Sequence, residues 1–320
     1  MILKPIHNPE DFTNKSETHL GVFGSQKWLQ IYGESLNYIG IYKDEQQLIG
    51  GFFYLKTKKF GATFIKLPPY TPHCGLFFVS DSKNKSSQNN FSKDIINEVC
   101  MYITKQKAAL TILAFPSNIV DLQPFIWDKY KVIPNYTYRI ALAQGIEDIK
   151  ANFDSKNRNV INKAIKENVE VGCDTLSKEE LFHFFMNALS STDANIYETE
   201  LKNIFLKFSD HTNSFAMVAK KDNKLAGVVF CVLDKTNCYY LLGGVDKQNG
   251  ISGVNNLLIQ HSIQKAKDLG CSIFDFEGSM LKGVEKFFRS FGPDLVPYYT
   301  VNKANLPLEL LLKFKKRELF

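Results

Sequence analysis

The feature that most constrains this fold is a strand–turn–strand pattern that occurs once in each half of the chain. The polar turns Asp44–Gln47 and Lys221–Lys224 each lie between two runs of apolar, β-type residues. In both copies Leu-x-Gly opens the second strand, and 177 residues separate Leu48 from Leu225. The pattern predicts a β-hairpin that has been duplicated along the chain.

The segments after each hairpin repeat as well, as a further strand region, a long helix and a short apolar strand. The predicted helices cover 91–106 and 252–269, and the predicted strands cover 110–115 and 272–276. Gly270 is a stop signal for the second helix, and the polar segment 81–90 is expected to be a mobile loop. We therefore expect an α/β (α+β) fold of two tandem domains, 1–145 and 146–320, each with a mixed, mostly antiparallel sheet flanked by helices.

Two further helical segments and a carboxyl-terminal tail are predicted in the second half. Asp154 or Ser155 can cap the first of them, and another follows at 178–190. The stretch 306–317 is either amphipathic or simply basic. One face of the first helix is apolar, with Val160, Ile161, Ala164 and Ile165, and the other carries Arg158, Asn162, Lys163 and Lys166.

Composition excludes several classes of protein. The chain of 320 residues is 44% hydrophobic and 22% charged, which is globular composition and excludes disordered and collagen-like chains. No apolar run reaches the ~20 residues that span a bilayer. The start contains Pro5 and Glu10 where a signal peptide would need an apolar region, so we expect a cytoplasmic protein. A net charge of +6 favours an anionic ligand such as a phosphate, a nucleotide or RNA.

Several familiar site motifs are missing. The six cysteines form no C-x-x-C pair and no zinc-type cluster with histidine, so we expect core thiols and no metal. The sequence has no G-x-S-x-G elbow and no G-x-x-x-x-G-K-[ST] loop. These absences argue against a serine hydrolase, a zinc enzyme and a P-loop nucleotidase.

The stretch from Leu241 to Gly253 reads as a strand, a glycine-bearing turn and a helix N-terminus. Backbone amides at such a place converge on one spot and favour a phosphate or a carboxylate. In the alternative reading Gly250 and Gly253 only relieve backbone crowding. The residues that we assign to cofactor binding are Lys247, Gln248, Gly250, Ser252 and Gly253. The buried face predicted for the following helix is Leu258, Ile259, Ile263, Ala266 and Leu269, with Asn256, Gln260 and Lys267 toward solvent.

Two carboxylates alternate with two phenylalanines at the end of the strand 272–276. Asp275 and Glu277 therefore share one strand face, where they can act as a general base or hold an amine. Alternatively they form a solvent-facing pair that binds Lys286 or Arg289. Three phenylalanines that follow, Phe287, Phe288 and Phe291, are expected to pack in the core.

Together these segments resemble the FemA/FemX-like (FemAB) group of the GNAT superfamily, which has two tandem GNAT-like domains. The resemblance covers most of the chain and depends on the order and spacing of its motifs. These are Phe23–Trp28, Ser155–Ala164, the run from Gly243 through Gly253 to Leu258, and Phe274–Ser279 followed by Phe287–Gly292.

The resemblance implies transfer of an acyl group to an amine. The best-known members take amino acids from aminoacyl-tRNA and attach them to a peptidoglycan precursor, and related groups use acyl-CoA. The family's Phe-Lys corresponds to Phe287-Phe288 here, with Arg289 as the nearest cation. The (Arg/Gln)-x-x-Gly-x-(Gly/Ala) pattern of acetyl-CoA enzymes is approximated by residues 247–252, and the coiled-coil insertion of some tRNA-using members is absent.

Three hypotheses remain open. The first is an N-acyltransferase with an acyl-CoA or similar donor and no tightly bound cofactor. The second is an aminoacyl-tRNA-dependent transferase acting on a cell-wall precursor, and the third is a non-catalytic module that binds a saccharide or peptide. The expected partners are a small molecule or a cell-wall precursor, with tRNA as an alternative, and no DNA. Peripheral membrane contact is expected through the basic tail. We assign catalysis to Glu277, Asp275 and Arg289, and substrate binding to Arg158, Lys163 and Tyr240.

Overall fold

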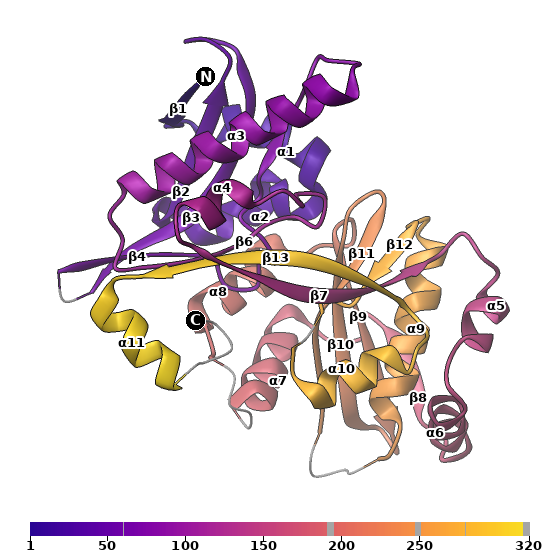
Figure 1. Ribbon diagram of the computed structural model, residues 1–320. Coiled ribbons are helices and arrows are strands. Elements are labelled where there is room, and N and C mark those ends of the chain that lie inside the picture. The colour runs from indigo at the N-terminus through magenta and orange to yellow at the C-terminus, as the bar shows by residue number, and fades with distance from the viewer. Residues whose placement is uncertain (60, 191–194, 247–250, 279, 316–320) are drawn as a thin grey trace. The chain divides into compact units, whose positions relative to one another are not determined.

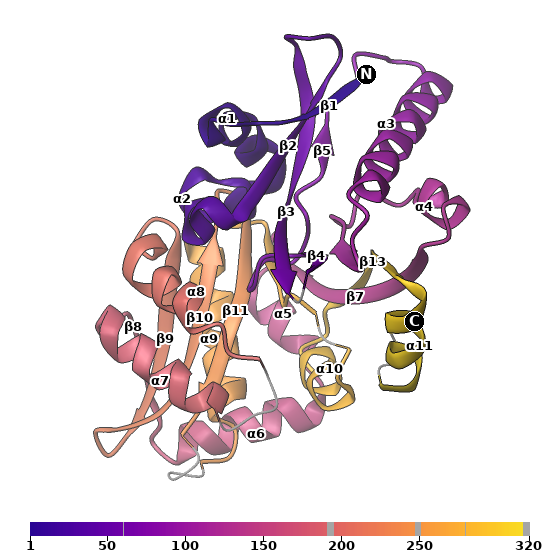
Figure 2. The ribbon, with the colours of Figure 1, turned by 90° about the vertical axis from the view of Figure 1, so that its left-hand side faces the viewer.

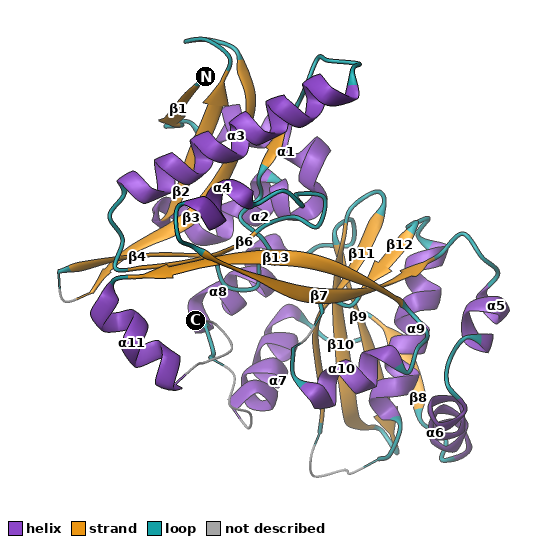
Figure 3. Ribbon diagram, viewed as in Figure 1, coloured by secondary structure: helices purple, strands orange, loops and turns teal. Residues whose placement is uncertain are grey.

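The computed structural model describes residues 1–59, 61–190, 195–246, 251–278 and 280–315 (Figure 1). The chain divides into two compact units. Unit 1 comprises Met1–Asn135 and Pro297–Phe320, and unit 2 is the continuous segment Tyr136–Val296. Each unit combines a sheet with flanking helices (Figure 3), which confirms the predicted α/β class.

The sheet of unit 1 has the strand order β1-β2-β3-β4-β6-β13, and β5 pairs with β3. Its neighbours are antiparallel except β4 and β6, which run parallel. The strands are β1 (Ile2–Pro5), β2 (Leu36–Tyr42), β3 (Leu48–Lys59), β4 (Ala62–Lys66), β5 (Phe77–Phe78), β6 (Leu110–Ala114) and β13 (Asp294–Ala304). The helices are α1 (Pro9–Leu20), η1 (Gly21–Gly24), α2 (Gln26–Leu29), η2 (Gln30–Ser35), α3 (Lys85–Lys105), α4 (Gln123–Trp127) and α11 (Leu306–Lys315).

The sheet of unit 2 has the strand order β7-β12-β11-β10-β9-β8. Again one pair, β11 and β12, is parallel and the others are antiparallel. The strands are β7 (Lys131–Ala141), β8 (Glu170–Cys173), β9 (Ser214–Lys221), β10 (Lys224–Leu233), β11 (Asn237–Val245) and β12 (Ile273–Asp275). The helices are α5 (Ile146–Ala151), α6 (Ser155–Lys166), α7 (Lys178–Ser190), α8 (Glu198–Asn203), η3 (Ile204–Phe208), α9 (Val254–Asp268) and α10 (Lys282–Arg289).

The two predicted hairpins are present, one in each unit. β2 pairs with β3 around a turn in which the Asp44 carboxylate accepts hydrogen bonds from the amides of Gln46 and Gln47. β9 pairs with β10 around Asp222 and Asn223, whose φ angles are 51° and 60°. Asp and Asn tolerate this left-handed geometry, which matches the twist of a two-residue hairpin.

The last strand of each sequence half belongs to the sheet of the other compact unit. In β7, Arg139–Ala141 pairs with β12 in unit 2. In β13, Thr300–Ala304 pairs with β6 in unit 1. The compact units therefore differ from the sequence halves 1–145 and 146–320, because these strands exchange partners. The boundary at 145/146 marks where the duplicated sequence divides, and it stays a prediction, because the compact units follow contacts in space and not the repeat.

Two local predictions need correction. Residues 85–90, predicted as loop, form the start of α3, because the Asn84 side chain caps the helix by accepting a hydrogen bond from the amide of Ser87. Leu269 is 46% exposed although it was placed on the buried face of α9. Its position at the C-cap, after the last helical residue, turns it away from the core. The other four residues of that face are buried as predicted.

The cysteines have the expected character. All six are free thiols, and all except Cys173 are buried. Burial raises the pKa of Cys74 to about 12, so this thiol stays protonated. Among the described residues, no helix has both the length and the apolar character that a bilayer-spanning segment needs.

Candidate active site

In unit 2, strands β11 and β12 are paired only over a short distance. The parallel pairing covers three positions and ends with Tyr239 opposite Asp275, while β11 continues to Val245. On its other side β11 stays paired with β10 as far as Gly227 opposite Val245. Within the part of the chain that the structure describes, the β12 side of Leu241–Val245 thus has no strand partner, and its backbone groups can receive an extended ligand.

A bulge accompanies this divergence. Phe230 lies opposite Leu242 and Cys231 lies opposite Tyr240, so Leu241 is an extra residue in β11. A bulge of this kind bends the strand and turns the following side chains to the other face. The bend begins next to the last β11–β12 pair.

The N-terminus of α9 follows β11 in sequence. Gly253, at the N-cap, has φ 89° and no side-chain cap. A Cβ atom there would lie 2.4 Å from the carbonyl oxygen of Val160 in α6, so only glycine fits. The uncapped first-turn amides and the helix dipole favour an anion at this end. Ser252 is exposed beside it, whereas the other predicted cofactor residues, Lys247, Gln248 and Gly250, lie outside the described residues.

Tyr240 connects β11 with α9 and α10. Its hydroxyl hydrogen-bonds the side chain of Asn255 in the first turn of α9, and burial raises its pKa. Its ring packs against Phe288, with centroids 5.5 Å apart. A Cβ atom on Gly243 would lie 1.7 Å from the Tyr240 hydroxyl, so the glycine leaves room for it. Tyr240 therefore lies beside the predicted anion site; its role toward a substrate remains a prediction.

A buried polar cluster lies at the end of β12. Asp275 is 3% exposed, and it accepts hydrogen bonds from Thr137 Oγ1 at 2.5 Å and from Arg139 Nε at 2.7 Å. The backbone amide of Glu277 donates to the same carboxylate at 2.9 Å. Arg139 and Thr137 come from β7, and sequence analysis missed both. Asp275 thereby fixes the direction of the chain that leads to Glu277.

Glu277 has an unusual backbone and an unusual acidity. Its φ is 59° and that of Gly278 is 70°, so the chain turns sharply after β12. A Cβ on Gly278 would lie 2.1 Å from the Tyr136 carbonyl oxygen, which excludes other residues there. Burial and the neighbouring Asp275 raise the pKa of Glu277 well above its ordinary value, and Arg139 opposes the shift. A carboxyl group whose pKa is raised in this way is a candidate for a general base or a general acid.

Arg289 does not pair with Glu277. Its Nε donates to Glu285 Oε1 at 2.7 Å, four residues earlier in α10. The same oxygen accepts a hydrogen bond from the Tyr138 hydroxyl, also at 2.7 Å. Arg289 and Tyr138 lower the pKa of Glu285, which therefore stays ionised. The alternative of a solvent-facing Asp275–Glu277 pair that binds Arg289 is therefore wrong, because Asp275 is buried and Arg289 is hydrogen-bonded to Glu285 instead.

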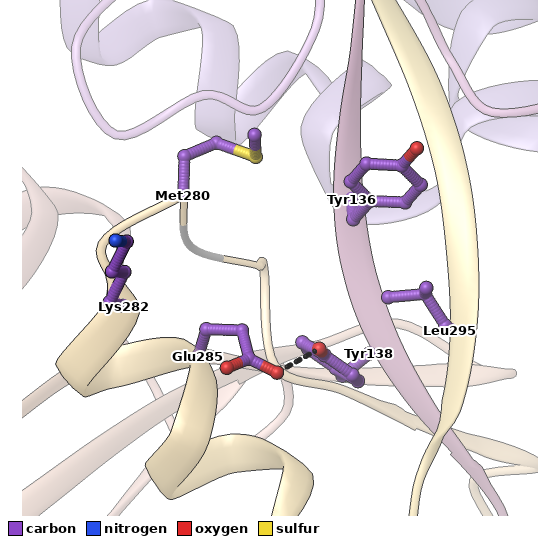
Figure 4. A pocket seen from close by; sticks show the side chains of 6 residues that line it. All are labelled: Tyr136, Tyr138, Met280, Lys282, Glu285 and Leu295. Atoms are coloured by element: carbon purple, nitrogen blue, oxygen red, sulfur yellow. Dashed lines mark hydrogen bonds between the residues drawn. The ribbon is translucent and has the colours of Figure 1, made fainter.

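Unit 2 contains a cavity of about 180 Å³ beside the hydrogen bonds that join Arg289, Glu285 and Tyr138 (Figure 4). Its walls are largely apolar, and Tyr138 and Glu285 contact each other at its side (Figure 4). The lining residues are Tyr136, Tyr138, Met280, Lys282, Glu285 and Leu295. An apolar cavity with one carboxylate and one ammonium group suits a small polar ligand with an apolar part.

The two basic residues predicted to bind substrate lie on α6. The guanidinium of Arg158 donates to the carbonyl oxygens of Ala151 and Phe153, so it closes the end of α5. Lys163 lies 3.9 Å from Glu167 and its side chain is 61% exposed. Their roles toward a substrate remain predictions.

Three of the motifs identified in the sequence meet in one hydrogen-bond network. Asn157 of α6 is buried; its Oδ1 accepts from Asn256 Nδ2 in α9 at 2.9 Å. Its Nδ2 donates to the carbonyl and hydroxyl oxygens of Ser290, after α10. Asn256 was expected to face solvent, but this bond directs it inward. The network holds α6, α9 and α10 around the site.

Within the described ranges, no three His, Cys, Asp or Glu side chains form a group suited to a metal ion.

The comparisons with known proteins agree with this architecture. Residues 155–289 match the family model described as an acetyltransferase (GNAT) domain. The match covers α6, α9, β12 and α10, which carry most of the residues above. A search of curated proteins found no match.

Several solved structures share the fold over nearly the whole chain. FemX is 14% identical, with a TM-score of 0.63 over 98% of this chain and 100% of its own. L-PGS from Bacillus licheniformis is 12% identical, with a TM-score of 0.56 and 96% of both chains covered. A tandem GNAT protein from the clavulanic acid biosynthesis pathway is 8% identical, with a TM-score of 0.53 over 94% of this chain and 98% of its own. Residues 155–289 thus form a domain of the acetyltransferase (GNAT) type, and the whole chain has the fold of FemX and of the tandem GNAT protein.

Proposed function

We propose that the protein is an N-acyltransferase that moves an acetyl or aminoacyl group from a thioester or ester donor to an amine. The observation that carries the proposal is the divergence of β11 from β12 beside the N-terminus of α9. The reaction needs a donor held in extended form, a proton acceptor for the amine and little covalent chemistry from the protein.

The donor would lie along the open edge of β11. The pantetheine arm of coenzyme A contains amide groups, which can pair with the unpaired backbone groups of Leu241–Val245. Its pyrophosphate would then lie at the N-terminus of α9, near Ser252 and Gly253. Lys247, Gln248 and Gly250 are the further residues that we assign to this anion.

The acceptor amine would lie near Glu277. The amine nitrogen attacks the acyl carbon, the carbon–sulfur or carbon–oxygen bond of the donor breaks, and the amine loses a proton. Glu277 would take that proton, because a carboxylate with a raised pKa is a stronger base than an ordinary one. Asp275 would act as a positioning residue, and Arg289 would bind an anionic part of the acceptor at the rim of the cavity.

The test is acyl transfer by the purified protein. It is incubated with acetyl-CoA and with a panel of amino sugars, diamines and peptide amines, and the products are identified by mass spectrometry. We expect an acylated amine and release of free CoA. Stabilisation by CoA at a hundredfold excess over Kd should be about 2.7 kcal/mol. Absence of both transfer and stabilisation, with every thioester tried, would exclude an acyl-CoA donor.

The match to FemX over the full length of both chains favours a second candidate, an aminoacyl-tRNA donor with a cell-wall precursor as acceptor. The exposed Lys163 and Lys166 on α6 could contact phosphates of the tRNA. Aminoacyl transfer from charged tRNA, without stabilisation by CoA, would favour this donor over the first. Binding of a saccharide or peptide without any transfer would favour a non-catalytic module.

A further inference from the structure

The last helix of unit 1 has an apolar face that no part of the described chain covers. In α11, Leu306, Leu310 and Phe314 follow one another at intervals of four residues and so form one row along the helix. Leu306 is 72%, Leu310 51%, Leu311 50% and Phe314 90% exposed. None of the residues of α11 is buried. Such a face is unfavourable in water and indicates a binding surface.

Lysines lie on both edges of this face. A helix turns by about 100° per residue, so Lys313 and Lys315 flank Phe314 on opposite sides. The acid of the helix, Glu309, forms an ion pair with Lys313, with 2.8 Å between their atoms. The helix therefore keeps a net positive charge, which comes from Lys315, and it presents no unpaired carboxylate to a partner.

A second exposed apolar group lies on the same side of unit 1. Figures 1 and 2 show α4 and α11 on the side of this unit opposite α1 and α2. In α4, Ile126 is 54% and Trp127 66% exposed. The Nζ of Lys93 lies 5.1 Å from the centre of the Trp127 ring. An exposed tryptophan beside a lysine is typical of residues that lie at the boundary between water and lipid.

We propose that this side of unit 1, formed by the exposed faces of α11 and α4 and called here the α11–α4 surface, binds an anionic lipid bilayer. The leucines and phenylalanine of α11 would enter the boundary between headgroups and acyl chains, and the lysines at its edges would contact anionic headgroups. Charge favours an anionic membrane as the occupant, because lysines flank the apolar row and the only carboxylate of the helix is paired with one of them. This inference does not depend on the proposed acyl transfer.

The full-length protein is mixed with vesicles of phosphatidylcholine alone and with vesicles that also contain phosphatidylglycerol. Co-sedimentation should show binding to the anionic vesicles only, and binding should weaken as salt rises. Trp127 gives a second signal, because the only other tryptophan, Trp28, is 0% exposed. Its fluorescence should shift to the blue when α4 reaches the lipid.

Variants test the two parts of the surface. L310E/F314E should abolish binding to anionic vesicles, and K313Q/K315Q should weaken it by about tenfold, because each lysine near the surface adds to the attraction. K83Q/K85Q is the matched control, since these two exposed lysines have the same spacing in unit 1. It should bind like the wild type. Because none of the changed residues is buried, circular dichroism should show an unchanged thermal transition.

Four results would overturn the proposal. One is wild-type protein that stays in solution with anionic vesicles at low salt. Another is equal vesicle binding by the wild type and L310E/F314E. The third is an equal loss of binding in K83Q/K85Q and K313Q/K315Q, which would indicate attraction by net charge alone. The fourth is a dimer, measured by light scattering, that L310E/F314E converts to monomer, because the apolar row would then be covered by a second copy of the chain.

Discussion

At the scale of single residues, the acidity of Glu277 gives the clearest test. Burial and Asp275 raise its pKa, so the folded state binds this proton more tightly than the unfolded state does. For an acid whose pKa is raised on folding, the stabilising contribution is present below the unfolded pKa and is lost as pH rises through the folded one. Wild-type stability should therefore fall between mildly acidic and alkaline pH because of this group.

Glu277→Gln should remove that pH dependence. Glutamine resembles the protonated acid and cannot ionise, so the variant should gain thermal stability relative to the wild type as pH rises. Melting temperatures of both proteins from pH 4 to pH 9 check this. Glu285→Gln is the contrasting control, because the pKa of Glu285 is lowered and its stabilising contribution is lost as pH falls. If the melting temperatures of the wild type and Glu277→Gln differ by the same amount at every pH, the prediction is wrong.

The same variant tests the chemistry. If Glu277 accepts the proton of the amine, Glu277→Gln should reduce turnover by about 10²–10⁴-fold while the fold is retained. The measurement is the acyl-transfer rate with an acceptor on which the wild type is active. Wild-type turnover in the variant would reduce Glu277 to a structural residue.

Arg139 should matter for stability. Its Nε donates to the buried carboxylate of Asp275 at 2.7 Å, so Arg139→Met leaves a buried acid with one fewer partner. Because Arg139 is itself 32% exposed, we expect the low end of the range for such losses, about 2–3 kcal/mol. Urea unfolding of Arg139→Met, Asp275→Asn and the double variant measures the coupling. Additive effects of the two changes would contradict a direct interaction.

At the scale of elements, α9 has a glycine in the left-handed region at each end. Gly253 has φ 89° and Gly270 has φ 84°. A Cβ at Gly253 would lie 2.4 Å from the carbonyl oxygen of Val160, whereas nothing lies within 4 Å at Gly270. An alanine should therefore strain the backbone to a similar extent at Gly253 and Gly270, whereas only at Gly253 would its Cβ atom clash with a neighbouring element.

Gly270→Ala should lower the free energy of unfolding by about 1–2 kcal/mol, the cost of a left-handed alanine. Gly253→Ala should lower it by more, because α6 must also move away from α9. It should weaken CoA binding as well, whereas Gly270→Ala should not. Urea unfolding and calorimetric titration with CoA check both expectations, and equal destabilisation by the two alanines would contradict them.

At the scale of the whole molecule, the exchange of β7 and β13 determines which segments can fold alone. Residues 136–296 contain β8 to β12 and the part of β7, Arg139–Ala141, that pairs with β12. Residues 1–135 lack β13, although Val301 of that strand is fully buried in the core of unit 1. The fold of unit 1 therefore depends on a segment from the far end of the chain.

A polypeptide of residues 136–296 should unfold in one cooperative transition. Residues 1–135 alone should not, and joining them to 297–320 through a short linker should restore cooperative unfolding. Circular dichroism on heating distinguishes these outcomes. A cooperative transition of 1–135 at the same temperature with and without 297–320 would show that β13 is dispensable for unit 1.

The sequence alone determined the features that depend on neighbouring residues. The two hairpins, the cap of α6 at Asp154 and the end of α9 before Gly270 are local, because periodicity, turn residues and caps act within a few positions. It also placed Asp275 near Glu277, but not their shared strand face, because β12 ends at Asp275 and Glu277 lies in the turn that follows.

Only the tertiary structure decided which distant residues meet. Arg139 and Asp275 are 136 residues apart, and Asn157 and Ser290 are 133 apart. No local pattern specifies such pairs, because they follow from the pairing of β7 with β12 and from the packing of α6, α9 and α10. Arg289 was expected to bind the Asp275–Glu277 pair, but the tertiary structure buries Asp275 against Arg139 and leaves Arg289 to Glu285, four residues earlier in α10.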